Sequence, residues 1–340
     1  MDKEISDLAK QFVLARITNV RGVDLTIFDF DYDLTWMAFF MNADQHVYSR
    51  FGGRDHENAE KALSLKGLKY SMRKALVAYK SDPKAKAERL KKPFRNVEDY
   101  PAARRVKKGT CIHCHQVHDF DREWRIQKKT WSKERIWVYP PPENVGLVLH
   151  PDQGDLVKAV LPKSPAAKAG IRANDVLQTV GDHTVNSYGD VQYQLNRAPQ
   201  HGKLAVTWKR GDQIMSGHLS LPSGWRKSDI SWRGSMWGLE PQAHVYGKNL
   251  TVEEKKKLGL SPKRLAFYQG NYVPPRSRQA GIRARDVIIG VDGKKLEMTM
   301  LQFNVWVRLN FKDGDRIVFN VIRRSKRMSF PMTLQARSSK

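Results

Sequence analysis

The feature that most constrains the fold is an internal repeat in the C-terminal half of the chain. The segment AGIRANDVL at 169–177 returns as AGIRARDVI at 280–288. A turn follows each copy, Gly-Asp at 181–182 and Asp-Gly at 292–293, and a helix-like apolar period and two strand-like segments come after it. In the first copy, Arg-Gly-Asp at 210–212 predicts the hairpin between those strands. The repeat predicts two copies of one folding unit.

Both copies resemble bacterial PDZ domains of the kind found after periplasmic proteases, and Ser-Pro-Ala-Ala at 164–167 fits the same pattern. The resemblance implies two α+β PDZ domains, which we expect at residues 143–223 and 234–336. Three prolines at 140–142 predict a stiff boundary before the first domain.

A PDZ domain binds an extended peptide as an added strand at a sheet edge, while loop amides hold the C-terminal carboxylate of the peptide. The resemblance therefore implies peptide or protein C-termini as partners. In the first copy we expect the site to be formed by Gly146, Leu147, Val148, Leu149, Val191 and Leu195. In the second copy the corresponding loop is 237–239, followed by a polar insertion at 251–263. The alternative is that one or both sites are filled internally and serve as spacers.

The composition narrows the class of protein. With 340 residues, of which 40% are apolar, the chain is long enough for two or three domains. No run of about 18 apolar residues occurs, so we expect no membrane span. The net charge of +25 is spread along the chain, and no zinc-finger, helix-turn-helix or RNP-like pattern accompanies it. We interpret the charge as a general basic surface and predict no nucleic-acid partner.

The only two cysteines lie in the segment CIHCH at 111–115. Two thiols with two residues between them, followed at once by histidine, are typical of c-type haem attachment. On this interpretation Cys111 and Cys114 form thioethers with the haem, and His115 is the proximal ligand of the haem iron. The pattern predicts haem c for electron transfer or redox sensing, with an unknown redox partner.

Two other interpretations of this segment stay open. Cys111, Cys114 and His118 have a spacing that zinc sites also use, with His113 or the distant His56 as a fourth ligand. A disulfide or a dithiol at the two cysteines is the third interpretation. The aromatic residues between 120 and 137 would either line a haem face or attach a small insertion to its neighbours.

The first 80 residues have the element pattern of an incomplete α/β unit. We expect a helix at 2–11, strands at 12–17, 36–41 and 46–51, and a helix at 63–79. This order matches a thioredoxin-like domain, truncated at its N-terminus, at residues 1–80. Residues 81–142 are rich in Lys, Arg and Pro, and we expect a basic linker with a CxxCH insertion there.

A family resemblance connects these parts. The segment 21–44, the CIHCHQV run at 111–117 and the PDZ-like repeats are similar to a group of exported bacterial proteins. These combine a thioredoxin-7-like domain with PDZ domains, and some are selenoproteins. The resemblance implies a periplasmic or exported location, although the sequence shows no signal-peptide core. It also implies a CxxC or selenocysteine motif that would precede Met1, so we expect that the chain starts late.

The sequence predicts neither a hydrolase nor a complete thioredoxin active site. No GxSxG motif or Gly-Asn-Ser-Gly-like loop occurs, and no proline precedes Pro83 to supply the cis-proline of thioredoxins. We therefore expect an exported redox-associated protein that couples haem c to PDZ peptide binding. The alternative is a non-enzymatic periplasmic PDZ adaptor in which Cys111 and Cys114 hold a structural zinc ion or form a disulfide.

Overall fold

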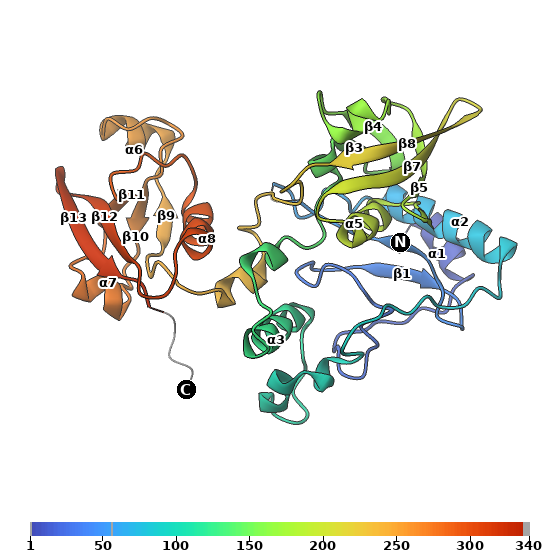
Figure 1. Ribbon diagram of the computed structural model, residues 1–340, viewed down its shortest axis with the longest axis horizontal. Helices are drawn as coiled ribbons and strands as arrows, with labels where there is room; N and C mark the ends of the chain where they lie inside the picture. Colours follow the sequence, from blue (N-terminus) through green and yellow to red (C-terminus); the bar gives the residue numbers. More distant parts are fainter. Residues whose placement is uncertain (1, 56, 336–340) are drawn as a thin grey trace. The chain divides into compact units, whose positions relative to one another are not determined.

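The computed structural model of the chain describes residues 2–55 and 57–335. It consists of two compact units, which divide between Ser228 and Asp229, and Figure 1 shows both in colours that follow the sequence. Each unit contains one copy of the repeat. The finer domain boundaries expected from the sequence stay a prediction. Within the described part of the chain, no helix has the length and apolar character needed to cross a bilayer.

The first repeat folds into an antiparallel six-stranded sheet with two helices. Its elements are β3 (Leu147–His150), β4 (Gln153–Val160), α4 (Pro165–Lys168), β5 (Val176–Val180), β6 (His183–Thr184), α5 (Tyr188–Arg197), β7 (Gly202–Arg210) and β8 (Gln213–Leu221). The strand order is β3-β4-β5-β7-β8, with β6 paired to β5. Strand β3 therefore lies at one edge of the sheet.

Alternating apolar side chains explain how this sheet forms. Along β7, Leu204, Val206 and Trp208 are buried, while the residues between them are more exposed. The predicted hairpin at 210–212 joins β7 to β8, and Gly211 adopts the left-handed conformation with φ 58°. One continuous apolar core results, shared by the strands and α5.

The region before the first repeat contains a two-stranded sheet and several helices. Its elements are α1 (Lys3–Ala9), β1 (Ala38–Met41), β2 (Val47–Phe51), α2 (Leu65–Ser81), α3 (Cys114–Gln127) and the 3-10 helices η1 (Val97–Asp99), η2 (Pro101–Arg105), η3 (Lys133–Ile136) and η4 (Pro142–Val145). The predicted strands at 36–41 and 46–51 and the helix at 63–79 are confirmed within a few residues.

The expected thioredoxin-like fold is wrong. Such a fold needs a central sheet of several strands covered by helices, whereas among the described residues β1 and β2 pair only with each other. The segment 12–17, predicted as a further strand, forms no strand, and Val13 and Leu14 are 99% and 74% exposed. A local apolar run resembles a strand, but it becomes one only where a partner strand takes up its backbone hydrogen bonds.

Two small cores hold this N-terminal region together. The β1–β2 hairpin and α2 share a core that includes Phe40, Phe51 and Met72. The loop before β1, the first 3-10 helices and α3 share another, with Tyr32 and Phe120 among its members. A lone hairpin is only marginally stable in water, so the hairpin depends on what covers it.

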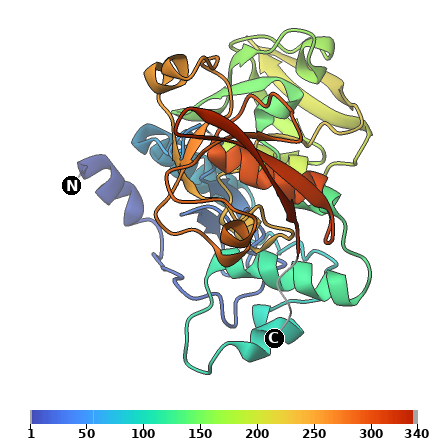
Figure 2. The same cartoon turned by 90° about the vertical axis from the view of Figure 1, so that its left-hand side faces the viewer.

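The second unit has an element order similar to that of the first repeat, with helix α6 added between its first two strands. It contains η5 (Gly234–Gly238), β9 (Gly247–Asn249), α6 (Val252–Lys257), β10 (Phe267–Gln269), α7 (Pro275–Gln279), β11 (Val287–Val291), α8 (Met300–Asn310), β12 (Arg316–Arg323) and β13 (Lys326–Thr333). The strand order is β13-β12-β11-β10-β9. Figure 2 shows the long, twisted β12–β13 hairpin in dark red. Strand β9 thus takes the edge position of β3, and α8 the position of α5.

Candidate peptide-binding site

The candidate site lies between the edge strand β3 and helix α5 of the first repeat. Leu147 and Leu149 of β3 belong to the same buried cluster as Val191 and Leu195 of α5. The fold therefore brings together four apolar residues that the sequence analysis assigned to one peptide-binding site. Val148, between the two leucines, is half-buried. We call this arrangement the β3–α5 site.

A glycine fixes the loop that enters β3. Gly146 has φ 88°, and a Cβ at this position would lie 2.0 Å from Oγ of Ser164. The carbonyl of Gly146 accepts a hydrogen bond from the amide of Leu161 at 2.9 Å. Only glycine fits both the left-handed conformation and the close approach. The loop backbone next to the edge strand therefore has one well-defined shape.

The apolar residues of the β3–α5 site are already covered by the chain itself. Leu147, Val191 and Leu195 are 0% exposed, and Leu149 is 6% exposed. A free groove that accepts a peptide side chain would leave part of its lining accessible to solvent.

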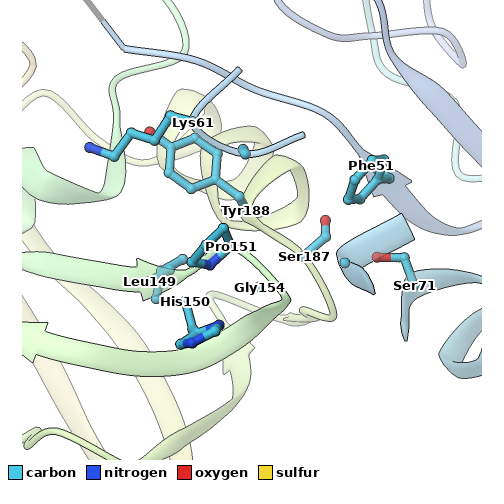
Figure 3. A pocket seen from close by; sticks show the side chains of 11 residues that line it. Phe51, Lys61, Ser71, Leu149, His150, Pro151, Gly154, Ser187 and Tyr188 are labelled. Carbon is cyan, nitrogen blue, oxygen red and sulfur yellow. The ribbon is translucent and has the colours of Figure 1, made fainter. Parts of the chain in front are cut away.

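Residues of the N-terminal region cover the end of the site where α5 begins, as Figure 3 shows. Ala62 is part of the same buried cluster as the β3 leucines. Gly53 lies so close to α5 that a Cβ would be 2.5 Å from the ring of Tyr188. Between these segments a cavity of about 10 Å³ remains, lined by Phe51 and Leu149 among others. This volume is about enough for one water molecule.

A buried carboxylate fastens the N-terminal hairpin to α5. Asp190 accepts hydrogen bonds from Oγ of Ser49 at 2.7 Å and from the amides of Arg50 at 2.8 Å and Asn186 at 3.1 Å. The guanidinium of Arg50 lies 4.0 Å from this carboxylate and 3.6 Å from the ring centroid of Tyr193. Burial raises the pKa of Asp190, although Arg50 and the hydrogen bonds act in the opposite direction.

Asp190 was not predicted as a functional residue from the sequence. Its position, three residues after the N-cap Ser187, is one where an acidic residue is common because it stabilises a helix N-terminus. That local explanation was sufficient, so nothing in the sequence pointed to a partner in β2.

An ion-pair cluster closes the junction near the entry to β3. Nζ of Lys61 lies 2.5 Å from the carboxylate of Asp55 and 2.8 Å from that of Glu143. Glu143 also accepts a hydrogen bond from the hydroxyl of Tyr188 at 3.3 Å. Burial lowers the pKa of Lys61, but its hydrogen bonds to the two carboxylates outweigh this effect and raise it. Lys61 is therefore a cation beside the loop that contains Gly146.

The cysteine segment lies in another part of the first unit. Cys111 is exposed, Cys114 at the start of α3 is half-buried, and the two thiols are not joined in a disulfide. Burial raises the pKa of Cys114, which makes its thiol less reactive at neutral pH. His115 is exposed, whereas His118 lies against two aspartates of the loop before β1. His56, considered as a fourth zinc ligand, lies outside the described residues.

The aromatic residues that could have lined a haem face pack against protein. Phe94 contacts both Tyr100 and Trp124, with ring centroids 4.3 Å and 4.9 Å away. Phe120 is 7% exposed and belongs to the same core. These contacts favour the second of the two roles considered for the aromatics, the attachment of the cysteine segment to its neighbours.

A family model described as a PDZ domain matches residues 156–210, from within β4 to the end of β7. The match includes α5 and therefore half of the β3–α5 site.

The curated relatives are named as probable periplasmic serine proteases. The chain is 22% identical over 145 residues to a probable periplasmic serine protease, do/HhoA-like, of Haemophilus influenzae; this covers 43% of the chain and 28% of the relative. It is 27% identical over 180 residues to a probable periplasmic serine endoprotease, DegP-like, of Brucella suis, covering 50% of the chain and 33% of the relative. The chain thus spans about a third of the length of the curated relatives it matches.

Solved structures with local similarity include a PDZ domain and an HtrA-type protease. One is the HtrA3 PDZ domain bound to a phage-derived ligand, FGRWV, with 20% identity, coverage of 22% of this chain and 63% of that one, and a TM-score of 0.18. Another is the HtrA-type protease AlgWS227A with a tripeptide, with 17% identity, coverage of 30% and 34%, and a TM-score of 0.25. Scores this low do not indicate a shared overall fold.

These relatives correct the function expected from the cysteine segment. The expected membership in a thioredoxin-7-like/PDZ family with a CxxCH motif is wrong, and so is haem c at Cys111, Cys114 and His115, because the curated relatives are named as serine proteases. The predicted electron transfer and redox sensing depended on haem c, so they are wrong as well. The non-enzymatic adaptor with a structural zinc ion or disulfide is not supported either. What the comparisons establish for this chain is a PDZ domain in its first repeat.

Proposed function

We propose that the first repeat binds the C-terminal end of an extended peptide along β3. The observation that carries this proposal is the position of β3 at the edge of the sheet, directly after the constrained loop at Gly146. Among the described residues, β3 pairs only with β4, so one side of the strand has backbone groups that an added peptide strand would satisfy. The PDZ family match supports this mode of binding.

The surroundings of the loop suit an anionic, apolar C-terminus. Val148 of β3 is half-buried and offers an apolar side chain on the edge strand, while Lys61 near the loop is already paired with Asp55 and Glu143. The net charge of +25 favours encounter with anionic ligands in general.

The N-terminal region limits how the peptide lies. Because Ala62 and Phe51 occupy the end of the site where α5 begins, a peptide longer than a few residues would have to displace them. We therefore propose that the ligand uses only its last few residues and leaves the β3–α5 site before it reaches the covered end.

The proposed setting is the periplasm, in the recognition of peptides for the proteolysis of exported proteins. The curated relatives support this setting because they are named as periplasmic serine proteases. Since the similarity spans about a third of their length, the proposal concerns recognition, and we assign no hydrolytic step to this chain.

Fluorescence anisotropy with labelled pentapeptides tests the proposal, starting from FGRWV and a library with apolar C-terminal residues. We expect peptides with a free carboxylate to bind at least about tenfold more tightly than the same peptides with an amidated C-terminus. Val148→Glu should weaken binding of the free-carboxylate form about tenfold, because the new charge on the edge strand repels the peptide carboxylate.

The matched control is Lys248→Glu, at the middle of the exposed edge strand β9 in the second unit, which should leave binding unchanged. The proposal is wrong if no peptide of the library binds, or if amidation and Val148→Glu have no effect on the affinity.

A further inference from the structure

An apolar segment that follows α1 lies open to solvent. It is the segment 12–17, with the sequence FVLARI. Val13 is 99% exposed, Leu14 is 74% exposed and Ile17 is 51% exposed. Figure 2 shows the segment as part of the open blue trace that leaves α1. Exposed apolar side chains that lie next to one another, unlike single ones, indicate a surface to which another molecule binds.

The backbone of this segment is unpaired as well. Residues 13–18 form no helix, strand, turn or bend, and within the described structure their amides and carbonyls form no hydrogen bond. The positions on either side are held, because the ring of Phe12 packs on that of Phe40 and the amide of Val20 donates to the carbonyl of Ile112 at 3.0 Å. A segment fixed at both ends, with free backbone groups between them, is a surface to which a strand can be added.

The charges around the segment are positive. Arg16 is exposed, and so are Lys107 and Lys108, which lie near the end of the segment because Arg21 donates to the carbonyl of Lys107 at 3.5 Å. In the part of the chain that the structure describes, Arg16 and these two lysines form no ion pair. The carboxylate of Glu98 is already paired with Arg21 at 3.6 Å. The charge here is therefore complementary to an acidic partner.

These properties together favour one kind of partner. A lipid surface would cover the apolar side chains but would leave the free amides and carbonyls of residues 13–18 without hydrogen bonds. A second copy of this chain would bring another Arg16 and a further net charge of +25, so like charges would meet. An extended polypeptide strand pairs the backbone groups and covers the apolar side chains, and acidic residues in it neutralise the unpaired cations.

We propose that residues 12–17 bind an extended strand of another protein in which apolar and acidic side chains alternate. Successive side chains of a strand point to opposite faces, so that Val13 and Ile17 share one face of the paired segment and Arg16 lies on the other. The apolar side chains of the ligand cover the first face, and its carboxylates lie on the face of Arg16. This site is separate from the β3–α5 site, and its ligand needs no free C-terminus.

Fluorescence anisotropy of the labelled peptide VEVEVEVE, acetylated and amidated, with the full chain tests the proposal. The blocked peptide lacks the carboxylate that the β3–α5 site requires, so the two sites are tested independently. We expect it to bind at least about tenfold more tightly than VKVKVKVK. Val13→Glu should weaken binding at least about tenfold, because it replaces a covered apolar side chain by a like charge. The matched control is Val77→Glu, at a 67% exposed valine of α2, which should leave the affinity unchanged.

Hydrogen exchange in the unmodified protein tests the backbone pairing. With saturating VEVEVEVE, exchange of the amides of residues 13–17 should slow at least about tenfold, while exchange in α2 should not change. Ala15→Pro removes one of these amides at an exposed position and should weaken binding at least about tenfold.

Several results would overturn the proposal. They are no binding of VEVEVEVE, equal affinity for VKVKVKVK, unchanged affinity in Val13→Glu and Ala15→Pro, and unaltered exchange at residues 13–17. A chain that sediments as a dimer without peptide, with slow exchange at residues 13–17, would overturn it in favour of a second copy as the partner.

Discussion

The two repeats share one buried hydrogen-bond network, but residues at equivalent positions outside this network make different contacts. In the first, the buried Asp175 accepts from the amide of Arg172 at 2.8 Å and from two nitrogens of Arg210 at 2.8 Å. In the second, Asp286 accepts from Arg283 at 2.8 Å and from two nitrogens of Arg323 at 2.7 Å. In each repeat the same arginine also donates to a glycine carbonyl of the AGIR segment at 2.7 Å. This network explains why the repeat is visible in the sequence.

The helices α5 and α8 show where the repeats diverge. Three residues after the N-cap Ser187, Asp190 of α5 binds Ser49 and Arg50 of the N-terminal hairpin. At the same position after Thr299, Gln302 of α8 accepts from the amide of its own N-cap at 2.8 Å and also donates to the carboxylate of Asp229. The same helical position thus holds a buried carboxylate with three donors from distant and neighbouring segments in one repeat, and in the other a neutral side chain that combines a capping box with one hydrogen bond to Asp229.

The edge strands differ as well. Strand β3 carries Leu147 and Leu149 in the core and follows the constrained Gly146 loop, whereas β9 is exposed along its whole length and is followed by α6. The loop expected to correspond, 237–239, lies at the end of η5 and is separated from β9. A shared framework therefore does not imply a shared binding site.

The largest expected difference between the repeats concerns Asp190 and Gln302. Asp190→Ala should lower the free energy of unfolding of the first unit by about 3 kcal/mol, because it leaves the buried Arg50 without its carboxylate partner. Gln302→Ala should cost the second unit about 1 kcal/mol, because it removes a cap and one hydrogen bond to Asp229. Native-state hydrogen exchange, measured separately in β7 and β12, gives both values. Equal losses in the two units would show that Asp190 acts as no more than a cap.

The next effect should be the same in both repeats. Asp175→Asn and Asp286→Asn each remove the buried negative charge that accepts from the partly exposed arginine, and each should cost its own unit about 2 kcal/mol. The same exchange measurement tests this equality. A loss confined to one repeat would mean that the common network supports only that copy.

The smallest expected effect is a change in stability with pH, which should have opposite signs for two carboxylates of the first unit. Burial raises the pKa of Asp155 above its ordinary value near 3.8, although the hydroxyl of Tyr70 and Lys74 oppose the shift. Burial also acts to raise the pKa of Asp175, but hydrogen bonds from Arg210 and the amide of Arg172 outweigh it and lower the pKa. The folded form therefore holds the proton of Asp155 more tightly than the unfolded form, and that of Asp175 less tightly.

Opposite pH dependences follow. The contribution of Asp155 to stability falls as the pH rises from about 3.8 through its raised pKa, and the contribution of Asp175 is lost as the pH falls below about 3.8. Urea unfolding of Asp155→Asn should therefore show a gain over the unmodified protein that is larger at pH 7 than at pH 3.5. Asp175→Asn should show a loss of stability relative to the unmodified protein that is smaller at pH 3.5 than at pH 7. If Asp155→Asn has the same effect at both pH values, its carboxyl does not titrate as the burial requires.

The sequence by itself determined the repeat and much of the local structure. The AGIR segments, the Gly-Asp and Asp-Gly turns and the alternation along β7 are decided by neighbours in the chain. Hydrophobic period and turn chemistry were therefore enough to predict the hairpin at 210–212 and the helix at 63–79. Four apolar residues assigned to the peptide site also lie together, because they follow the pattern of the repeat.

Only the tertiary structure decided what the N-terminal region is and what it does to the first repeat. The segment 12–17 has the composition of a strand but no partner strand, so it stays without one. The contacts of Asp190 with β2, of Ala62 with the β3 leucines and of His118 with Asp31 and Asp33 each join segments far apart in the chain. Such contacts depend on long-range packing, which leaves no periodic signal in the sequence, and a motif such as CIHCH therefore suggested a chemistry that its surroundings do not support.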